Sequence, residues 1–128
     1  MDPAKILLID SNREDRDTVS AFLSGEGYIV HSTDNGHEGL EKAKSDKFDL
    51  IILELNLSDI KGEEVCTRLK HGRNKRNTPI LVLSVRDEID EIEELFQRGV
   101  GDYIVKPPRL SHLISRVEFN IANKHGKK

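Results

Sequence analysis

Three short stretches of the chain consist entirely of apolar residues, with no polar position alternating between them. They span residues 6–9, 50–53 and 80–83 and contain only isoleucine, leucine and valine. Stretches of this length and composition are typical of strands buried on both faces, as in a parallel sheet. Two weaker apolar stretches, residues 28–30 and 103–105, predict two further strands.

Between these stretches, apolar residues recur at the three- and four-residue intervals of an amphipathic helix. Ser11 and Glu14 have the spacing of a capping box, so we expect Ser11 to cap the first of five helices. Asp34 or Asn35 is expected to open the second helix. The clearest stripe lies in the fourth helical segment and ends at Gly99. The apolar positions of the five stripes are Val19, Phe22, Leu23, Leu40, Ala43, Val65, Leu69, Ile89, Ile92, Leu95, Phe96, Leu110, Leu113, Ile114, Val117 and Ile121.

Strands and helices thus alternate five times along the chain. Parallel neighbours need a crossover connection, and an amphipathic helix is the usual one. We therefore predict the α/β class, with a single doubly wound, five-stranded parallel sheet of the (βα)5 type formed by one domain over residues 1–123. Residues 124–128 are expected to form a basic C-terminal tail or the start of a linker.

Composition narrows the class of protein. The 128 residues suffice for one ordinary domain, and 36% of them are hydrophobic. The formal net charge of −3 excludes a strongly basic, phosphate-seeking surface. No apolar run approaches the roughly 18 residues of a membrane-spanning helix, and the first residues lack a signal-peptide profile, so we expect a cytoplasmic protein that engages no membrane. The single cysteine, Cys66, permits no internal disulfide and is expected to be a buried apolar group.

Polar side chains follow four of the predicted strands. Asp10 and Ser11 follow the first, residues 54–56 follow the third, Ser84 follows the fourth and Lys106 follows the fifth. Ligand chemistry in open α/β sheets gathers at the carboxyl ends of the strands, so these side chains are expected to converge on one edge. Two carboxylates, one hydroxyl and one ammonium therefore form the candidate site.

In this order and at these separations, the residues resemble those of the receiver domain of two-component response regulators, over residues 5–123. The acceptor segment of that family is similar to residues 48–57, followed here by Gly62. The resemblance implies a flavodoxin-like receiver fold and a cis peptide bond between Lys106 and Pro107. The implied roles are acid pocket for Asp10 and Ser11, phosphoacceptor position for Glu54, switch for Ser84 and Tyr103, and phosphoryl contact for Lys106.

Three departures from the family pattern bear on chemistry. Active receivers have two adjacent acids after the first strand and an aspartate after the third, where this chain has Ser11 and Glu54. A small residue commonly follows the switch hydroxyl, where this chain has Val85. Loss of an anionic ligand weakens a Mg²⁺ site, and a carboxylate displaced by about an ångström can slow a positioned reaction on the order of 100-fold. We therefore assign no metal site. If Mg²⁺ binds at all, we expect it to bind weakly through Asp10, Glu54 and the Asn56 backbone.

These substitutions predict a receiver-like domain of a response regulator in phosphorelay signal transduction that is not phosphorylated in the ordinary way. We expect that it does not act as an enzyme and that it serves as a protein-interaction module. Glu54 either stands in for a phosphoryl group by reaching Lys106 and Ser84, or only forms an ion pair with Lys106. The alternative is a phosphorylatable receiver with weakened Mg²⁺-dependent chemistry at Glu54 or a nearby acid such as Asp10 or Asp59. An unrelated enzyme or nucleotide binder on a flavodoxin-like fold is disfavoured because the chain has no phosphate-binding glycine-loop motif.

The resemblance also implies a protein partner at the surface of the fourth helix, fifth strand and fifth helix. A histidine kinase, an output domain or a second copy in a homodimer would fit that surface. An acidic stripe on the fourth helix would select a basic partner. Its residues are Asp87, Glu88, Asp90, Glu91, Glu93 and Glu94. The basic segment over residues 70–76 lacks the aromatic platforms or reading helix of a nucleic-acid-binding surface, so nucleic acid is not an expected partner.

Overall fold

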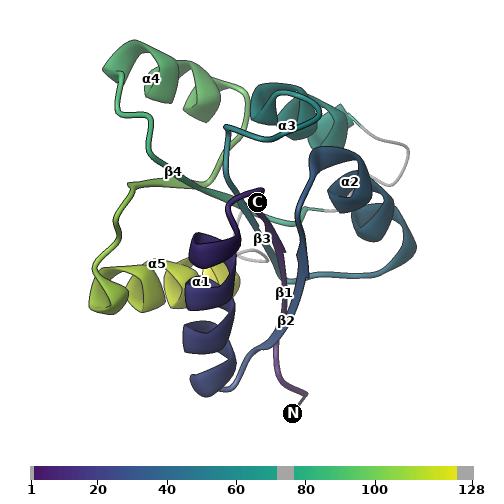
Figure 1. Cartoon of the computed structure of the whole chain (residues 1–128), viewed down its shortest axis with the longest axis vertical. Helices are drawn as coiled ribbons and strands as arrows, with labels where there is room; N and C mark the ends of the chain where they lie inside the picture. Colours follow the sequence, from purple (N-terminus) through teal and green to yellow (C-terminus); the bar gives the residue numbers. More distant parts are fainter. Residues whose placement is uncertain (1, 72–76, 124–128) are drawn as a thin grey trace.

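The apolar stretches form the interior of a parallel sheet, as the sequence predicts. The structure is a computed structural model that describes residues 2–71 and 77–123 (Figure 1). Its strands, in the order β2-β1-β3-β4-β5, are all parallel. In the described residues the strands are β1 (Lys5–Ile9), β2 (Ile29–Thr33), β3 (Leu50–Leu53), β4 (Ile80–Ser84) and β5 (Asp102–Val105), and the helices are α1 (Arg13–Gly25), α2 (Gly36–Ser45), α3 (Gly62–His71), α4 (Ile89–Gln97) and α5 (Leu110–Asn123). The predicted doubly wound α/β class is confirmed.

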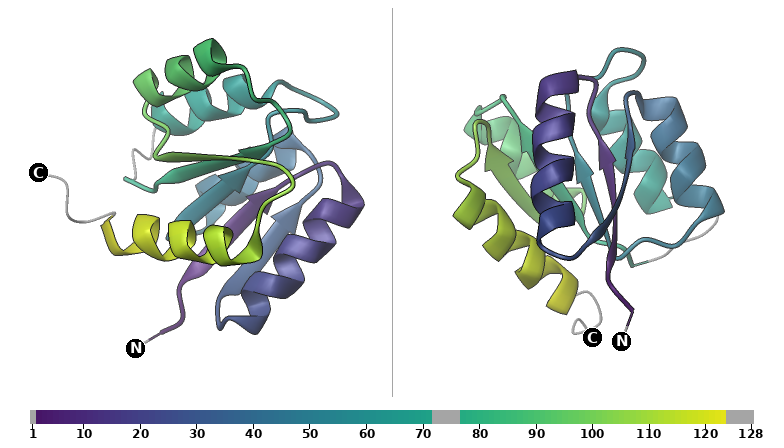
Figure 2. Two further views of the ribbon diagram at one scale, coloured as in Figure 1. Left: turned by 90° about the vertical axis from the view of Figure 1, so that its left-hand side faces the viewer. Right: turned by 60° about the horizontal axis from the view of Figure 1, so that its bottom comes forward.

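Helices cover both faces of the sheet, which explains why the central strands carry no polar alternation. Figure 2 shows α1 and α5 against one face and α2, α3 and α4 against the other. Alternate residues of a strand point to opposite faces. Accordingly, Ile6 and Leu8 pack with the α1 and α5 side chains, whereas Leu7 and Ile9 belong to the cluster that includes α3 residues. Cys66 lies in the latter cluster and is buried, as predicted.

The start of the first helix differs from the prediction. Asn12, not Ser11, caps α1, because the Asn12 side chain accepts a hydrogen bond from the backbone N–H of Asp15. The Ser11 hydroxyl instead bonds to other loops, so the capping-box interpretation is wrong by one residue. Of the two candidates for the second helix, Asn35 is the cap of α2, and it accepts from the N–H of Glu38.

The fourth helix buries less of its apolar stripe than its pattern indicates. Of the nine residues of α4, all described, only Leu95 is buried. Ile89 is 70% exposed and Phe96 is 44% exposed. An amphipathic pattern reports that one face of a helix is apolar but not how much of that face the rest of the domain covers. Two acids of the predicted stripe, Asp87 and Glu88, precede the helix rather than lying on it.

Two predicted features lie partly or wholly outside the described residues. The basic segment contributes Lys70 and His71 to the end of α3, and residues 72–76 are not described. The predicted tail over residues 124–128 is also outside the description. None of the helices within residues 2–71 and 77–123 combines the length and the apolarity that a membrane crossing requires.

Close backbone packing at Gly62 predicts that a larger residue there destabilises the domain. A Cβ at this position would lie 2.5 Å from the Leu55 Cα, and the Gly62 N–H donates to the Leu55 carbonyl oxygen. Because backbone cannot move aside like a flexible side chain, we expect Gly62→Ala to lower the free energy of unfolding by about 1–3 kcal/mol in urea titrations.

Gly25→Ala is the matched control for that measurement. A Cβ at Gly25, in the last turn of α1, would meet no heavy atom within 4 Å. Because alanine has a higher helix propensity than glycine, Gly25→Ala is expected to leave the free energy of unfolding unchanged or to raise it by up to about 1 kcal/mol. Equal effects of the two substitutions would contradict the crowding at Leu55.

Candidate functional site

The carboxyl ends of four parallel strands bring the predicted polar residues together. Asp10 follows β1, Glu54 follows β3, Ser84 ends β4 and Lys106 follows β5. Asp10, Glu54 and Ser84 are at most 4% exposed, and the Lys106 side chain is 6% exposed. Buried charges are stable only when they are paired and hydrogen-bonded, so the partners of each group determine what this site can do.

Glu54 bonds to groups from three strands or the loops that follow them. Its Oε1 lies 2.8 Å from the Lys106 Nζ. Its Oε2 accepts hydrogen bonds from the Ser84 hydroxyl, at 2.5 Å, and from the backbone N–H of Asn56, at 2.9 Å. The ion pair with Lys106 that the sequence predicts is therefore present. Both carboxylate oxygens of Glu54 are engaged.

Lys106 contacts two further carboxylates. Its Nζ lies 2.8 Å from an Asp10 oxygen and 2.7 Å from an Asp15 oxygen, in addition to Glu54. We call Asp10, Asp15, Glu54 and Lys106 the charged cluster. Burial on its own lowers the pKa of Lys106, but its hydrogen bonds with the three carboxylates outweigh burial and hold that pKa above its ordinary value. The peptide bond between Lys106 and Pro107 is cis, as the resemblance implies.

Sequence reasoning missed Asp15. It lies in the first turn of α1, five residues after Asp10, and its side chain is 41% exposed. The available signal was that the N-terminal turn of a helix after β1 lies at the same edge as the strand ends. An acid at the start of a helix also stabilises the helix by itself, so Asp15 in the sequence did not by itself indicate a site residue.

Asp10 is the most buried carboxylate of the charged cluster. Its Oδ1 accepts from the backbone N–H of Asn12 at 2.9 Å, and its Oδ2 contacts Lys106. Burial raises the pKa of Asp10, the bonds with Lys106 and Asn12 act in the opposite direction, and the Glu54 charge adds to the increase, so that the pKa lies above its ordinary value. Three carboxylates around one ammonium leave the cluster with surplus negative charge.

Ser11 lies beside this cluster without joining it. Its hydroxyl donates to the Asp34 carbonyl oxygen at 2.8 Å and accepts from the Ser58 N–H at 3.0 Å. In this structure the second acid beside Asp10 at the Lys106 ammonium is therefore Asp15, and not a residue at position 11. The Asp59 carboxylate is engaged elsewhere, where it accepts from two N–H groups at the start of α2.

These contacts bear on the divalent cation that the family implies. Mg²⁺ requires a near-octahedral set of free oxygen donors. The Ser11 hydroxyl and both Glu54 oxygens already bond to protein groups, and the described residues contain no group of three His, Cys, Asp or Glu side chains arranged to hold a metal. As arranged, these donors do not form a Mg²⁺ site, and the weak binding predicted through Asp10, Glu54 and the Asn56 backbone would require Glu54 to release one of its protein partners.

The two switch candidates are linked through one loop residue. The Ser84 hydroxyl, which donates to Glu54, lies 3.3 Å from the Arg86 N–H and accepts from it. The Tyr103 hydroxyl donates to the Arg86 carbonyl oxygen at 2.7 Å. A continuous series of hydrogen bonds therefore runs from Glu54 through Ser84 and Arg86 to Tyr103. Arg86 was not among the candidates, since an arginine in a loop carries no pattern that distinguishes it.

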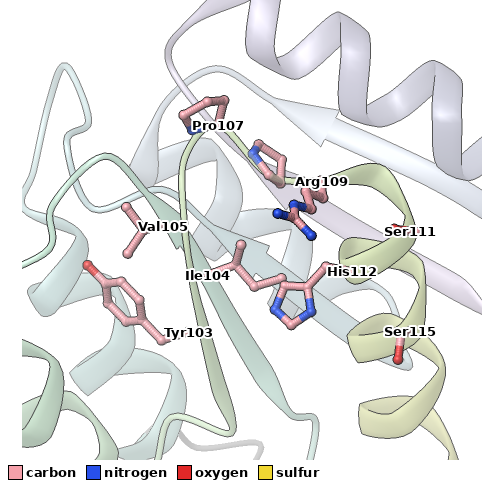
Figure 3. Close-up of a pocket in the computed structure, with 9 residues that line it drawn as sticks. Tyr103, Ile104, Val105, Pro107, Arg109, Ser111, His112 and Ser115 are labelled. Atoms are coloured by element: carbon pink, nitrogen blue, oxygen red, sulfur yellow. The ribbon is translucent and has the colours of Figure 1, made fainter.

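Of two cavities near the site, one lies apart from the charged cluster and the other reaches its edge. One, of about 610 Å³, lies between β5 and α5, and its lining includes Tyr103, Arg109 and His112 but none of the four cluster residues (Figure 3). A second, of about 420 Å³, is a groove beside α1 and the start of α5. Asp15 and Lys106 reach its wall, and Val85, which is 56% exposed, forms part of its lining. The charged cluster is therefore separate from the cavity beside β5 and borders the groove beside α1 through Asp15 and Lys106.

Known proteins share this arrangement of strands and helices. The chain is similar to the chemotaxis protein CheY4 of Vibrio cholerae, with 29% identity and a TM-score of 0.85 over 91% of this chain and 98% of that one. A CheY-like receiver domain protein of Methanospirillum hungatei has the same fold, with 21% identity and a TM-score of 0.90 over 98% and 99% of the two chains.

Curated relatives are longer than this chain. The cell cycle transcriptional regulator CtrA of Caulobacter vibrioides is 36% identical over 122 residues, which are 95% of this chain and 52% of CtrA. The transcriptional regulatory protein HprR of Escherichia coli is 34% identical over 121 residues, 94% of this chain and 53% of HprR. The chain thus spans about half the length of these relatives. The family model of the response regulator receiver domain matches residues 6–118, and the chain therefore belongs to that family of two-component signalling domains.

Proposed function

We propose that this receiver domain has its signalling state set by Glu54 instead of by phosphorylation, and that it acts by binding protein partners without catalysing a reaction. The observation that supports this most is the position of the Glu54 carboxylate. It contacts both Lys106 and Ser84, the side chains to which the family resemblance assigns the phosphoryl contact and the switch. A simple ion pair would need only Lys106. The further series of bonds to Tyr103 favours the reading in which Glu54 stands in for a phosphoryl group.

A glutamate does not reproduce the full charge of a phosphoryl group. It carries one negative charge, whereas a phosphoryl group carries about 1.5 to 2 at neutral pH. Asp15 reduces this difference, because its carboxylate also lies 2.7 Å from the Lys106 ammonium. Lys106 thereby bonds to as much negative charge as an acid and a phosphoryl group would provide.

The same contacts oppose an ordinary phosphorylation cycle. An incoming donor needs a free acceptor oxygen in line with the phosphorus, and both oxygens of Glu54 are bonded. The donor is itself an anion, and the charged cluster already has surplus negative charge. The receiver is therefore proposed to hold one state and to need no donor.

The partner surface is proposed to include α4, β5 and α5. Receiver domains of response regulators interact with kinases and output domains, and half of each curated relative lies beyond the matched region. On this chain the surface has exposed apolar side chains, Ile89, Phe96 and Val105, next to the acidic residues that follow β4. A partner with apolar and basic side chains would complement it.

Treatment with a phosphodonor tests the proposal. With acetyl phosphate and millimolar Mg²⁺, we expect the intact mass of the chain to stay unchanged, because Glu54 offers no free oxygen. The double variant Ser11→Asp, Glu54→Asp restores the family's acids and is the control, expected to gain the mass of one phosphoryl group. A gain by the unmodified chain, mapped to Glu54, Asp10 or Asp59, would instead support the weakened phosphorylatable receiver.

The raised pKa of Asp10 determines whether its contribution to the free energy of unfolding rises or falls with pH. Because burial raises the pKa above its ordinary value of 3.8, the folded protein binds a proton at pH values where the unfolded chain has released it. The contribution of Asp10 to the free energy of unfolding therefore falls as pH rises from 3.8 through the raised pKa. We expect the stability of the wild type relative to Asp10→Asn to fall over that interval, measured in urea titrations between about pH 4 and pH 7.

Asp46→Asn is the control for the sign. The hydrogen bond from Lys5 lowers the pKa of Asp46 below 3.8, so its ionised form favours the folded state. The stability of the wild type relative to Asp46→Asn is expected to rise with pH, and only below about pH 4. A flat or rising difference for Asp10→Asn would contradict the unfavourable burial of that carboxylate.

A further inference from the structure

Arg86 lies where the site and the fourth helix meet. It is in the four-residue loop between β4 and α4, and its backbone bonds to both switch residues. Its N–H donates to the Ser84 hydroxyl and its carbonyl oxygen accepts from Tyr103. Ser84 donates in turn to Glu54. The backbone position of Arg86 therefore depends on the contacts of the Glu54 carboxylate.

The Arg86 side chain makes a second connection to the same carboxylate. Its Nε donates to the Asn56 side-chain oxygen at 2.8 Å, and the Asn56 backbone N–H donates to the Glu54 Oε2. The guanidinium side chain is 26% exposed, which limits solvent screening of these contacts. Backbone and side chain of Arg86 thus depend on Glu54 by two separate routes.

From there the guanidinium contacts two helices. Its Nη1 bonds to the Glu63 Oε2 in the first turn of α3 and lies 3.9 Å from the Glu91 Oε1 in the first turn of α4. The other oxygen of Glu63, Oε1, is buried and has no hydrogen-bond partner among the described residues. A planar guanidinium can hold several acceptors at fixed angles, which a lysine ammonium cannot.

Few other contacts hold the start of α4. The residue that caps it, Glu88, makes no side-chain capping hydrogen bond, and Leu95 is the one buried residue among the nine described in α4. A helix with so little buried surface can shift at low cost in free energy. The loop before it and the Arg86 contacts to its first turn therefore have a large share in its placement.

We propose that Arg86 is the positioning residue that couples Glu54 to α4. This inference rests on the proposed function, because it names how the state set by Glu54 reaches the partner surface. When Glu54 holds Ser84 and Asn56, Arg86 is fixed between α3 and α4, and the first turn of α4 is held in one position. When Glu54 loses its charge, the loop relaxes and α4 moves. Arg86 thus makes the partner surface dependent on a buried carboxylate that no partner touches.

A double-mutant cycle read by NMR tests the coupling. Amide chemical shifts of the full chain are recorded for the wild type, Glu54→Gln, Arg86→Ala and the double variant. We expect Glu54→Gln alone to shift the resonances of Ser84 and Tyr103 and those of α4. In the Arg86→Ala background, its effect on α4 is expected to fall about threefold or more, while its effect on Ser84 persists.

Two further variants separate positioning from a general loss of structure. Arg68→Ala removes the exposed pair between Arg68 and Glu64 on α3, which has no contact with the charged cluster, and is expected to leave the α4 response unchanged. Arg86→Lys keeps the charge toward Glu63 but loses the fixed geometry to Asn56, and is expected to restore the α4 response only in part.

The outcomes distinguish failure of this inference from failure of the proposed function. If Glu54→Gln shifts α4 equally with and without Arg86, or if Arg68→Ala reduces the response as much, the coupling role of Arg86 is wrong while the role of Glu54 stands. If Glu54→Gln leaves Ser84 and Tyr103 unshifted, the proposed function itself is wrong.

Discussion

The ion pair between Glu54 and Lys106 is the interaction on which the site depends. It is buried at the carboxyl edge of the sheet, and each partner has further bonds that a change in the other would disturb. Removing one member of a buried pair leaves an uncompensated charge and typically costs about 3–5 kcal/mol. In this domain the cost would extend to the Ser84 and Asn56 contacts of Glu54 and to the Asp10 and Asp15 contacts of Lys106. The pair therefore links the charge balance of the site to Ser84, the residue that precedes the loop after β4.

The parallel sheet makes this arrangement possible. Residues far apart in the sequence meet because all strand ends lie at one edge, where Asp10, Glu54 and Ser84 are buried. Low polarity around the cluster strengthens each bond and makes each unpaired group costly. The Glu54 carboxylate, one methylene longer than that of an aspartate, bonds to Lys106 and Ser84 together. Under the proposed function, this carboxylate stands permanently where a phosphoryl group would otherwise be transferred.

The sequence predicted the sheet well because two-sided burial leaves a distinctive pattern. The apolar stretches at residues 50–53 and 80–83 coincide with β3 and with all but the last residue of β4. Order and spacing also anticipated the contacts of Glu54 with Lys106 and Ser84. Asp15 and Arg86 were missed because their roles arise from side chains that reach across loops, and such contacts leave no periodic signal. The cap of α1 was misassigned because Ser11 satisfies the capping pattern while its hydroxyl bonds to Asp34 and Ser58 instead.

The central claim is that Glu54 holds the switch residues in one arrangement without a phosphodonor. The most direct measurement is ¹⁹F NMR of the chain labelled with 3-fluorotyrosine, which reports on Tyr103 beside only one other tyrosine, Tyr28. We expect a single Tyr103 resonance that is unchanged by acetyl phosphate and Mg²⁺ and that moves to a second position, or exchanges between two, in Glu54→Ala. A Tyr103 resonance that is the same in Glu54→Ala and the wild type, or one that the phosphodonor moves in the wild type, would contradict this claim.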